Sequence, residues 1–383
     1  MIQNHIQVWI PDMFGFKGGI QTYSAFLLQA LQSLQPEASY QVFLKRDRAP
    51  LPQHSYLPKT QFYTSGHLPL KLQTAGFATQ LVTQGLLQKP DLIITTHVNF
   101  SPVANWLKQI AGIPYWIIAH GVDVWNIERP ALKQALKNSN QILAVSNYTR
   151  DRLLTEQTLS SDQVVLLPNT FDISRFKIKA KPTHLLEKYN LQANQPIILT
   201  VNRLCASETY KGYDKVLEAL PIIQTQIPNA HYIIVGKGDD RARLENYIQE
   251  LDLEDSVTLA GFIPDEELCD YYNLCDVFAM PSKLEGFGIV YLEALASGKP
   301  CLGGNQDGAI DALCNGEFGA LVNPDHVEEI AQALIEILQG SYPNSLLYQP
   351  ETLRDKVIET YGFDRFQERL AKLLNDSPIG LKQ

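Results

Sequence analysis

The sequence contains no apolar run of about 18 residues or more, so no segment resembles a helix that spans a membrane. The opening stretch MIQNHIQVWIPD lacks a basic region followed by an apolar stretch and a small-residue cleavage site, and it reads as a first buried strand. Cysteine is scarce: the five cysteines all lie in the second half and show no CxxC spacing. We therefore expect reduced core thiols, no metal site, and a cytoplasmic protein.

The chain also lacks the glycine fingerprint GxGxxG of dinucleotide-binding enzymes. The nearest match, VGKGDDRARLE, has Gly236 and Gly238, but Arg241 stands where a third glycine is required. The Gly18–Gly19 pair in FGFKGGIQTY does not fit the fingerprint either. These departures disfavour a nicotinamide-dependent enzyme.

Charge is unevenly distributed along the chain. The net charge of −9 is the sum of +4 in residues 1–170 (13 Lys+Arg, 9 Asp+Glu) and −13 in residues 171–383 (19 and 32). A basic first half suits an anionic partner such as a lipid surface, although ordinary surface scatter explains it equally well. The stretches KRDRAPLPQHSYLPK and LKLQTAGFATQLVTQGLL either touch a membrane or form a solvated loop and a core helix.

What the sequence does contain is an alternation of short β-rich runs and amphipathic stretches over 383 residues with 45% apolar composition. This pattern predicts an α/β fold with two doubly wound, Rossmann-like domains that face each other across a cleft. We expect an N-terminal domain over residues 1–170, a polar linker over 171–195, a C-terminal domain over 196–360, and a final helix over 361–383 that crosses back to the first domain.

The most informative stretch is SKLEGFGIVYLE, which follows the predicted strand DVFAMPS. Glu285 falls in the loop before a helix that begins near Gly288, and Glu293 falls inside that helix. The free N–H groups of the helix N-terminus suit a diphosphate, and Gly286 and Gly288 let the backbone approach a ligand around Phe287. The carboxylates need not touch, because each can accept hydrogen bonds from a different pair of hydroxyls. The alternative is a capping glutamate and a solvated one.

Two cations follow the predicted strand PIILTVNRL: Arg203 directly, and Lys211 just before a glycine and a helix. Together they suit a diphosphate, although loop cations are often merely solvated. Gly18 and Gly19 stand between the first strand and the first long helix, where consecutive glycines open an anion site or simply form a flexible loop.

Histidines end two strands of the first half. His120 ends PYWIIAH and is followed closely by Asp123, while His97 ends DLIITTH. A histidine at the carboxyl end of a strand can contact a ligand hydroxyl, but a lone histidine is more often structural. Gln21 and Tyr23, just after the glycine pair, are candidate acceptor contacts.

Together these motifs resemble the retaining, nucleotide-sugar-dependent glycosyltransferases of the GT-B fold, in the group 1 or GT4 family. PSKLEGFGIVYLEALASGKP matches the E-x7-E motif of that family, VNRL…YKG its Arg and Lys pair, and GGIQTY its glycine loop. VGKGDDRARLE and LPNTFD resemble the second-domain nucleotide strand, with Gly236, and the crossover into the linker. Two departures stand out: Arg203 and Lys211 are eight positions apart, which implies an extra loop, and LPNTFD replaces the commoner Asn-Gly-Val-Asp.

The resemblance implies a role for each matched residue. Glu285 would contact the hydroxyls of the donor sugar, Glu293 those of the ribose, and His120 the sugar near its anomeric carbon. Arg203 and Lys211 would hold the diphosphate, and Gly18 and Gly19 would close over it from the first domain. The remaining donor-binding residues by this resemblance are Gly18, Gly19, Gly236, Gly286, Phe287 and Gly288.

The resemblance further implies transfer of a hexose from a UDP- or GDP-linked donor to a hydroxyl of a glycan, a lipid-linked acceptor or a small molecule, as in polysaccharide or glycolipid biosynthesis. Members work without a bound metal or other cofactor, and no DxD motif stands at a strand end here. No nucleic acid partner is expected. The alternatives are a same-fold epimerase or phosphorylase and a non-catalytic nucleotide-sugar-binding subunit. The sequence leaves open the donor, the acceptor, the oligomeric state and any peripheral contact with the inner face of the membrane.

Overall fold

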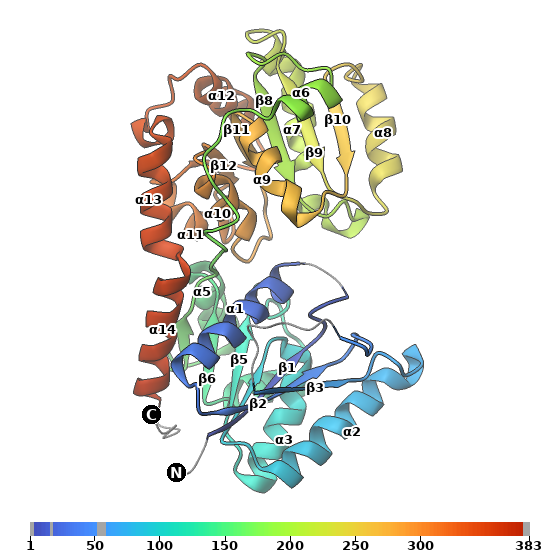
Figure 1. Ribbon diagram of the computed structural model, residues 1–383, viewed down its shortest axis with the longest axis vertical. Helices are drawn as coiled ribbons and strands as arrows, with labels where there is room; N and C mark the ends of the chain where they lie inside the picture. Colours follow the sequence, from blue (N-terminus) through green and yellow to red (C-terminus); the bar gives the residue numbers. More distant parts are fainter. Residues whose placement is uncertain (1–3, 16–17, 52–58, 378–383) are drawn as a thin grey trace. The chain divides into compact units, whose positions relative to one another are not determined.

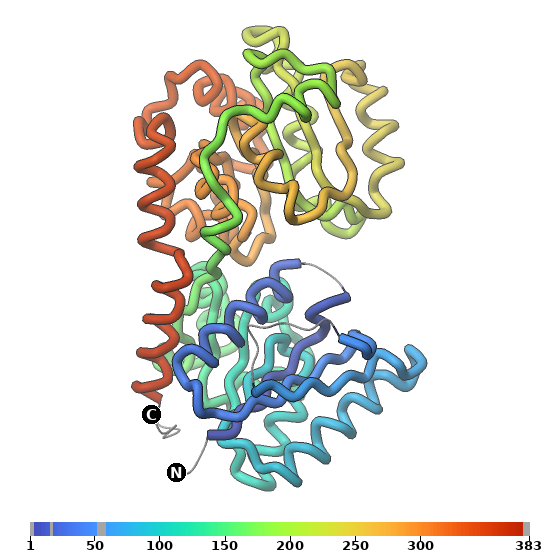
Figure 2. Tube along the Cα trace, viewed as in Figure 1, coloured from blue at the N-terminus to red at the C-terminus, as the bar shows by residue number. Residues whose placement is uncertain are grey.

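A computed structural model describes residues 4–15, 18–51 and 59–377 of the chain. The contacts between residues divide the chain into two compact units. Unit 1 consists of residues 1–170 and 363–383, and unit 2 consists of residues 171–362. Figure 1 labels their elements, and Figure 2 traces the chain by residue number.

Unit 1 contains one parallel sheet of seven strands within the described residues, in the order β3-β2-β1-β4-β5-β6-β7. Its strands are β1 His5–Ile10, β2 Ser39–Leu44, β3 Thr60–Thr64, β4 Leu92–Thr95, β5 Tyr115–Ala119, β6 Gln141–Ala144 and β7 Val164–Leu166. Its helices are α1 Gly19–Leu34, α2 Leu70–Gln88, α3 Ser101–Ala111, α4 Pro130–Asn138, α5 Asn147–Gln157 and α14 Phe363–Asp376, with a short 3₁₀ turn, η1 Val98–Phe100.

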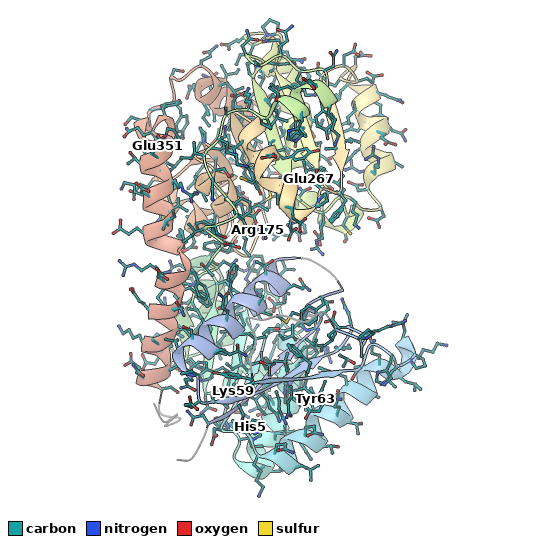
Figure 3. All side chains as sticks on the ribbon, viewed as in Figure 1. His5, Lys59, Tyr63, Arg175, Glu267 and Glu351 are labelled. Atoms are coloured by element: carbon teal, nitrogen blue, oxygen red, sulfur yellow. The ribbon has the colours of Figure 1, made fainter. Side chains whose placement is uncertain are left out.

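Both faces of this sheet are covered, which explains why its central strands are almost continuously apolar. Side chains of α2, α3, α4 and α5 pack on one face in a cluster that contains Trp9 and Ile117. Helix α1 lies on the opposite face (Figure 1). On the edge strand β3, Tyr63 stacks its ring on that of Phe43, with centroids 4.8 Å apart (Figure 3).

Unit 2 contains one parallel sheet of six strands within the described residues, in the order β10-β9-β8-β11-β12-β13. Its strands are β8 Ile197–Val201, β9 His231–Val235, β10 Val257–Gly261, β11 Val277–Met280, β12 Cys301–Gly304 and β13 Ala320–Val322. Its α-helices are α6 Thr183–Lys188, α7 Tyr213–Gln224, α8 Arg241–Glu250, α9 Asp265–Leu274, α10 Ile289–Ala296, α11 Ala309–Ala312, α12 Val327–Leu338 and α13 Pro350–Tyr361. Its 3₁₀ turns are η2 Ala206–Lys211, η3 Cys314–Gly316 and η4 Ser345–Tyr348.

This sheet is also covered on both faces. Helices α7, α8 and α12 pack on one face around Tyr232 and Leu302. On the other face, Phe278 of β11 packs edge-on against Tyr291 of α10, with ring centroids 5.6 Å apart, and lies beside Tyr272 of α9. The predicted α/β class with two doubly wound parallel sheets is therefore confirmed.

Two strands were not predicted, because neither carries the long apolar signal of its neighbours. Strand β3 has the sequence TQFYT and is only partly buried at the sheet edge, and β13 is three residues long.

The segment predicted as a linker, residues 171–195, contains helix α6 and belongs to unit 2. All five cysteines are free; Cys269, Cys275 and Cys301 are buried, whereas Cys205 and Cys314 are half-buried. No helix in the described part of the chain is both long and apolar enough to cross a bilayer.

The last helix, α14, belongs to unit 1 and packs on α1. Its buried residues Phe366, Leu370 and Leu374 recur every four positions and form one apolar stripe. The Phe366 ring lies edge-on to Tyr23 of α1, with centroids 5.5 Å apart. Figure 2 shows the two helices side by side, one from each end of the chain.

This packing predicts that the C-terminal helix stabilises unit 1. Because the fully buried Leu370 side chain fills the contact, the L370A substitution should lower the free energy of unfolding of unit 1 by about 2–5 kcal/mol. All four tryptophans of the chain lie in unit 1, so denaturant unfolding followed by tryptophan fluorescence reports on this unit alone. The matched control K372A, at an exposed position of the same helix, should leave the midpoint unchanged. Equal midpoints for L370A and the control would contradict the prediction.

Candidate functional site

The strongest candidate site lies in unit 2, at the carboxyl ends of β8 and β11. These two strands are neighbours in the sheet but not in the sequence, so the strand order reverses between them. Loops that follow strands at such a point diverge to opposite faces and leave room for a ligand. Arg203 and Lys211 follow β8, and Glu285 follows β11, so the topology brings together the residues that the sequence singled out.

Lys211 and Glu285 form a largely buried ion pair. The Lys211 Nζ lies 2.7 Å from the Glu285 Oε2, and the two side chains are only 13% and 20% exposed. Burial works against the charged form of Lys211, but the charge and the hydrogen bond of Glu285 outweigh it and raise the pKa of the lysine above its usual value. Lys211 is therefore a fixed cation at neutral pH.

Arg203 is paired with a residue that the sequence did not point to. Its guanidinium donates to the carboxylate of Glu208, which lies in η2, the loop that makes the spacing between Arg203 and Lys211 long. Half of the Arg203 side chain is exposed, while Glu208 is mostly buried. The two cations that were predicted to bind a diphosphate thus lie in the segment that follows β8, and each is paired with its own carboxylate.

The helix that follows Glu285 opens with a glycine in a left-handed conformation. Gly288 has φ 89° and caps α10, and a Cβ at this position would lie 2.5 Å from the Tyr291 ring. Only glycine therefore allows the turn from Gly286 and the buried Phe287 into the helix. The N–H groups of the first turn carry the partial positive charge of the helix end, which favours an anion.

Glu293 lies on α10 and has different partners from Glu285. The Tyr272 hydroxyl of α9 donates to its Oε2 at 2.7 Å. Burial raises the pKa of Glu293 to about 7, against the hydrogen bond from Tyr272 and the charge of Arg175. Arg175, labelled in Figure 3, lines a cavity of about 340 Å³ together with Asp265 and Glu266 of the adjacent α9 region. The two carboxylates have different partners, which fits the expectation that they need not touch.

Beside Arg203, the Asn202 amide is buried, and neither of its polar atoms has a hydrogen-bond partner among the described residues. Gly236, which follows β9, packs against the Asn202 backbone: a Cβ at Gly236 would lie 1.9 Å from the Asn202 backbone carbonyl oxygen. A buried amide without partners costs about 1–3 kcal/mol, which suits a group that a ligand completes. The sequence analysis missed Asn202, although it directly precedes Arg203.

In unit 1 the predicted histidines meet at the carboxyl ends of β4 and β5. Burial, followed by the repulsion that His97 exerts when it is protonated, lowers the pKa of His120 to about 3, and a hydrogen bond to the Thr96 backbone acts in the opposite direction. The His120 Nε2 is buried and has no hydrogen-bond partner among the described residues. Burial also lowers the pKa of His97 to about 4. Both rings are therefore neutral at pH 7.

Asp123 holds the backbone at this point. Its Oδ1 accepts the His120 backbone N–H at 3.0 Å, and burial raises its pKa to about 7. The ring of His120 meets the ring of Tyr23 edge-on, with centroids 5.1 Å apart. Tyr23 is itself buried, and its hydroxyl donates to the Leu167 carbonyl at 3.2 Å. Of the two candidate acceptor contacts after the glycine pair, Tyr23 therefore lies in the interior of unit 1.

The glycine pair begins the first helix of unit 1. Gly18 caps α1 in an extended conformation, and Gly19 is its first residue. The Gln21 amide donates to the buried Asp12. The preceding loop is pinned by Asp47, whose carboxylate accepts the backbone N–H groups of residues 13–15 at 2.6, 3.0 and 2.7 Å. Asp47 lies in KRDRAP, where the sequence indicated only charge.

The chain resembles known proteins in both of its halves. The sequence pattern of the glycosyl transferases group 1 matches residues 183–359, and that of glycosyltransferase family 4 matches residues 17–175. The GDP-mannose-dependent alpha-(1-6)-phosphatidylinositol monomannoside mannosyltransferase of Mycolicibacterium smegmatis is 31% identical over 268 residues, 67% of this chain and 68% of that protein. The protein of the same name from Mycobacterium tuberculosis is 31% identical over 231 residues, 57% of this chain and 59% of the relative.

Solved structures show the same fold. The sucrose-phosphate synthase of Thermosynechococcus elongatus has a TM-score of 0.81 at 23% identity, over 97% of this chain and 98% of that one. Anabaena HepE in complex with UDP and glucose has a TM-score of 0.78 at 21% identity, over 97% of this chain and 100% of that one. Three findings support one family assignment: the two matched sequence patterns, a relative aligned over two thirds of both chains, and the two doubly wound sheets. The chain belongs to the group 1 glycosyltransferases, family GT4, of the GT-B fold.

Proposed function

We propose that this glycosyltransferase moves a hexose from a nucleotide-diphosphate sugar to a hydroxyl of a glycan, a lipid-linked acceptor or a small molecule, with retention of configuration at the anomeric carbon. The proposal rests mainly on the buried ion pair of Lys211 and Glu285 just before helix α10, in which the lysine Nζ lies 2.7 Å from the glutamate Oε2. A fixed cation beside a hydroxyl-binding carboxylate suits a sugar attached to a diphosphate.

The chemistry requires negative charge to grow on the departing diphosphate while the sugar becomes oxocarbenium-like. Lys211, Arg203 and the free N–H groups at the start of α10 would stabilise that charge, and groups placed in advance supply most of such an effect. Glu285 would hold the sugar hydroxyls, and Glu293 would accept hydrogen bonds from the ribose. The roles that the family resemblance implies for Gly18, Gly19 and His120 stay predictions.

Retention would follow from attack on the same face that the diphosphate leaves. Glu285 is bound by a lysine and is therefore poorly placed to act as a free nucleophile. A phosphate oxygen of the donor would then take the proton of the acceptor hydroxyl, so the C–O bond to the acceptor forms as the C–O bond to the diphosphate breaks. The two cations make a resident metal unnecessary in this scheme.

The names of the relatives indicate which donor should be tested first. The mycobacterial relatives are GDP-mannose-dependent mannosyltransferases, which favours GDP-mannose over UDP-linked hexoses. Their lipid acceptor also supports a role in glycolipid or polysaccharide assembly. The five free cysteines fit a reducing compartment, and we place the reaction in the cytoplasm.

The first test is calorimetric binding of GDP and UDP in the presence of EDTA, followed by incubation of GDP-mannose or UDP-glucose with methyl glycosides and lipid-linked sugars. We expect one nucleoside diphosphate to bind without metal, because the protein supplies the countercharges. Proton NMR of the product should show the α-configuration of the donor. A β-linked product would contradict retention, loss of binding in EDTA would contradict metal independence, and a rearranged donor without transfer would indicate an epimerase.

The E285Q substitution should lower kcat by about 10²–10³, because it removes a charged group that acts in the transition state. The matched control is E254Q, at an exposed glutamate of the same unit, which should retain full activity. Circular dichroism melting of both variants separates loss of function from loss of fold. Unchanged turnover by folded E285Q would contradict the role of Glu285, whereas a folded native protein that binds the donor without transfer would favour a binding subunit.

Glu293 should make donor binding depend on pH. Its pKa lies at about 7, and only the ionised carboxylate accepts hydrogen bonds with both oxygens. The affinity for the intact nucleotide sugar should therefore fall by about tenfold from about pH 8 to about pH 6. A nucleotide sugar has no phosphate monoester, the group that itself titrates near about pH 6. E293Q should bind more weakly at the higher pH and lose the pH dependence in calorimetry; a wild-type slope in E293Q would contradict this assignment.

A further inference from the structure

A buried carboxylate outside the proposed donor contacts lies directly behind the Glu285 loop. Asp307, in the segment between β12 and α11, is 0% exposed. Its Oδ2 accepts the Ser282 hydroxyl and the Glu285 backbone N–H, both at 2.7 Å, and its Oδ1 accepts the Ala309 backbone N–H at 2.9 Å. Asp307 therefore ties its own segment to both ends of the turn that carries Glu285.

The Asp307 segment also donates a hydrogen bond to the Glu285 turn. The Gly308 backbone N–H donates to the Glu285 carbonyl at 2.8 Å. A Cβ at Gly308 would lie 2.1 Å from the Gly286 carbonyl oxygen, so glycine is required for this approach. Both backbone polar groups of Glu285 are thus held by two consecutive residues, which fixes the direction in which its side chain leaves the loop.

Other parts of the loop have other supports. The Lys283 backbone N–H donates to the Tyr210 carbonyl at 3.0 Å, so the start of the loop is attached to the η2 segment that carries Lys211. Asp307 holds the loop at the Ser282 hydroxyl and at the Glu285 backbone N–H. Loss of the Asp307 carboxylate would loosen Glu285, while the Lys283 backbone would stay attached to Tyr210.

Burying the Asp307 carboxylate costs free energy, because its charged form loses contact with water. Burial raises its pKa to about 7, with the hydrogen bonds from Ser282, Glu285 and Ala309 acting in the opposite direction and the charge of Glu285 adding to the increase. A neutral side chain would close the loop at a lower cost in desolvation. What a carboxylate adds is acceptor capacity on two oxygens, with stronger and more directional bonds to N–H groups.

We infer that Asp307 is a positioning residue for sugar transfer: it holds the Glu285 backbone so that the Glu285 carboxylate faces Lys211 and the hydroxyls of the donor sugar. This inference rests on the proposed function. Asp307 itself touches no substrate and acts through Glu285. A displacement of a reacting contact by about 1 Å costs on the order of a hundredfold in rate, so the effect should appear in turnover.

The test is a double-mutant cycle of D307N and E285Q, with kcat and nucleoside diphosphate affinity measured for each variant. Asparagine keeps the size of the side chain, but its NH₂ group must oppose one of the N–H or O–H donors. We expect D307N to lower kcat by about a hundredfold and to leave the affinity for the nucleoside diphosphate within about twofold, because Glu293 and Lys211 stay in place. In the E285Q background D307N should cause no further loss of kcat.

S282A provides a milder second variant in case D307N does not fold. It removes one donor to Asp307 and leaves both backbone bonds of Glu285, so kcat should fall several-fold in the native background and not at all with E285Q. Equal losses of kcat in the native and E285Q backgrounds would overturn the inference, and so would a D307N variant with native kcat. If the native protein transfers no sugar, the proposed function fails; if E285Q alone has native kcat, only the role proposed for Glu285 fails, and both results are distinct from failure of the inference.

Discussion

A lysine ammonium and a glutamate carboxylate meet at 2.7 Å under the carboxyl ends of β8 and β11, and the rest of the site is arranged around that contact. Neither charge is tolerable alone at this depth, because burial without a partner costs several kcal/mol. The protein therefore keeps Lys211 ionised by supplying Glu285, and the raised pKa of the lysine records the result. A donor diphosphate would meet a cation that is already formed and already oriented.

Parallel sheet topology explains why this contact exists. Strands β8 and β11 are adjacent although β8 ends at Val201 and β11 begins only at Val277, so their loops converge without any local signal. The same reversal of strand order occurs between β1 and β4 of unit 1, where the loop pinned by Asp47 and His97 both follow the strands. In each unit, a buried carboxylate (Asp307 or Asp47) accepts backbone N–H groups from a loop at this edge of the sheet. The fold fixes its loops by the same physical means twice.

Much of this arrangement could be predicted from the sequence, because its signals are local. Apolar runs predicted the strands of both sheets except β3 and β13, and strand ends predicted where Arg203, Lys211 and Glu285 would gather. Glu208 and Asp307 could not be predicted in the same way. Glu208 lies in the extra loop and looks like a solvated charge, and Asp307 reaches Glu285 across 22 positions of sequence. Their roles arise from the closure of two loops, which no periodicity in the sequence encodes.

The ion pairs of the site affect how it would bind a donor. Arg203 is paired with Glu208 and Lys211 with Glu285, so each cation is already neutralised by a carboxylate. Under the proposed function, binding of a diphosphate would exchange one anionic partner for another instead of filling an open cationic pocket. If the diphosphate took over Lys211, the Glu285 carboxylate would regain acceptor capacity beside the sugar hydroxyls. Because Glu285 is held through its backbone by residues 307–308, its side chain can change partners while the loop stays in place.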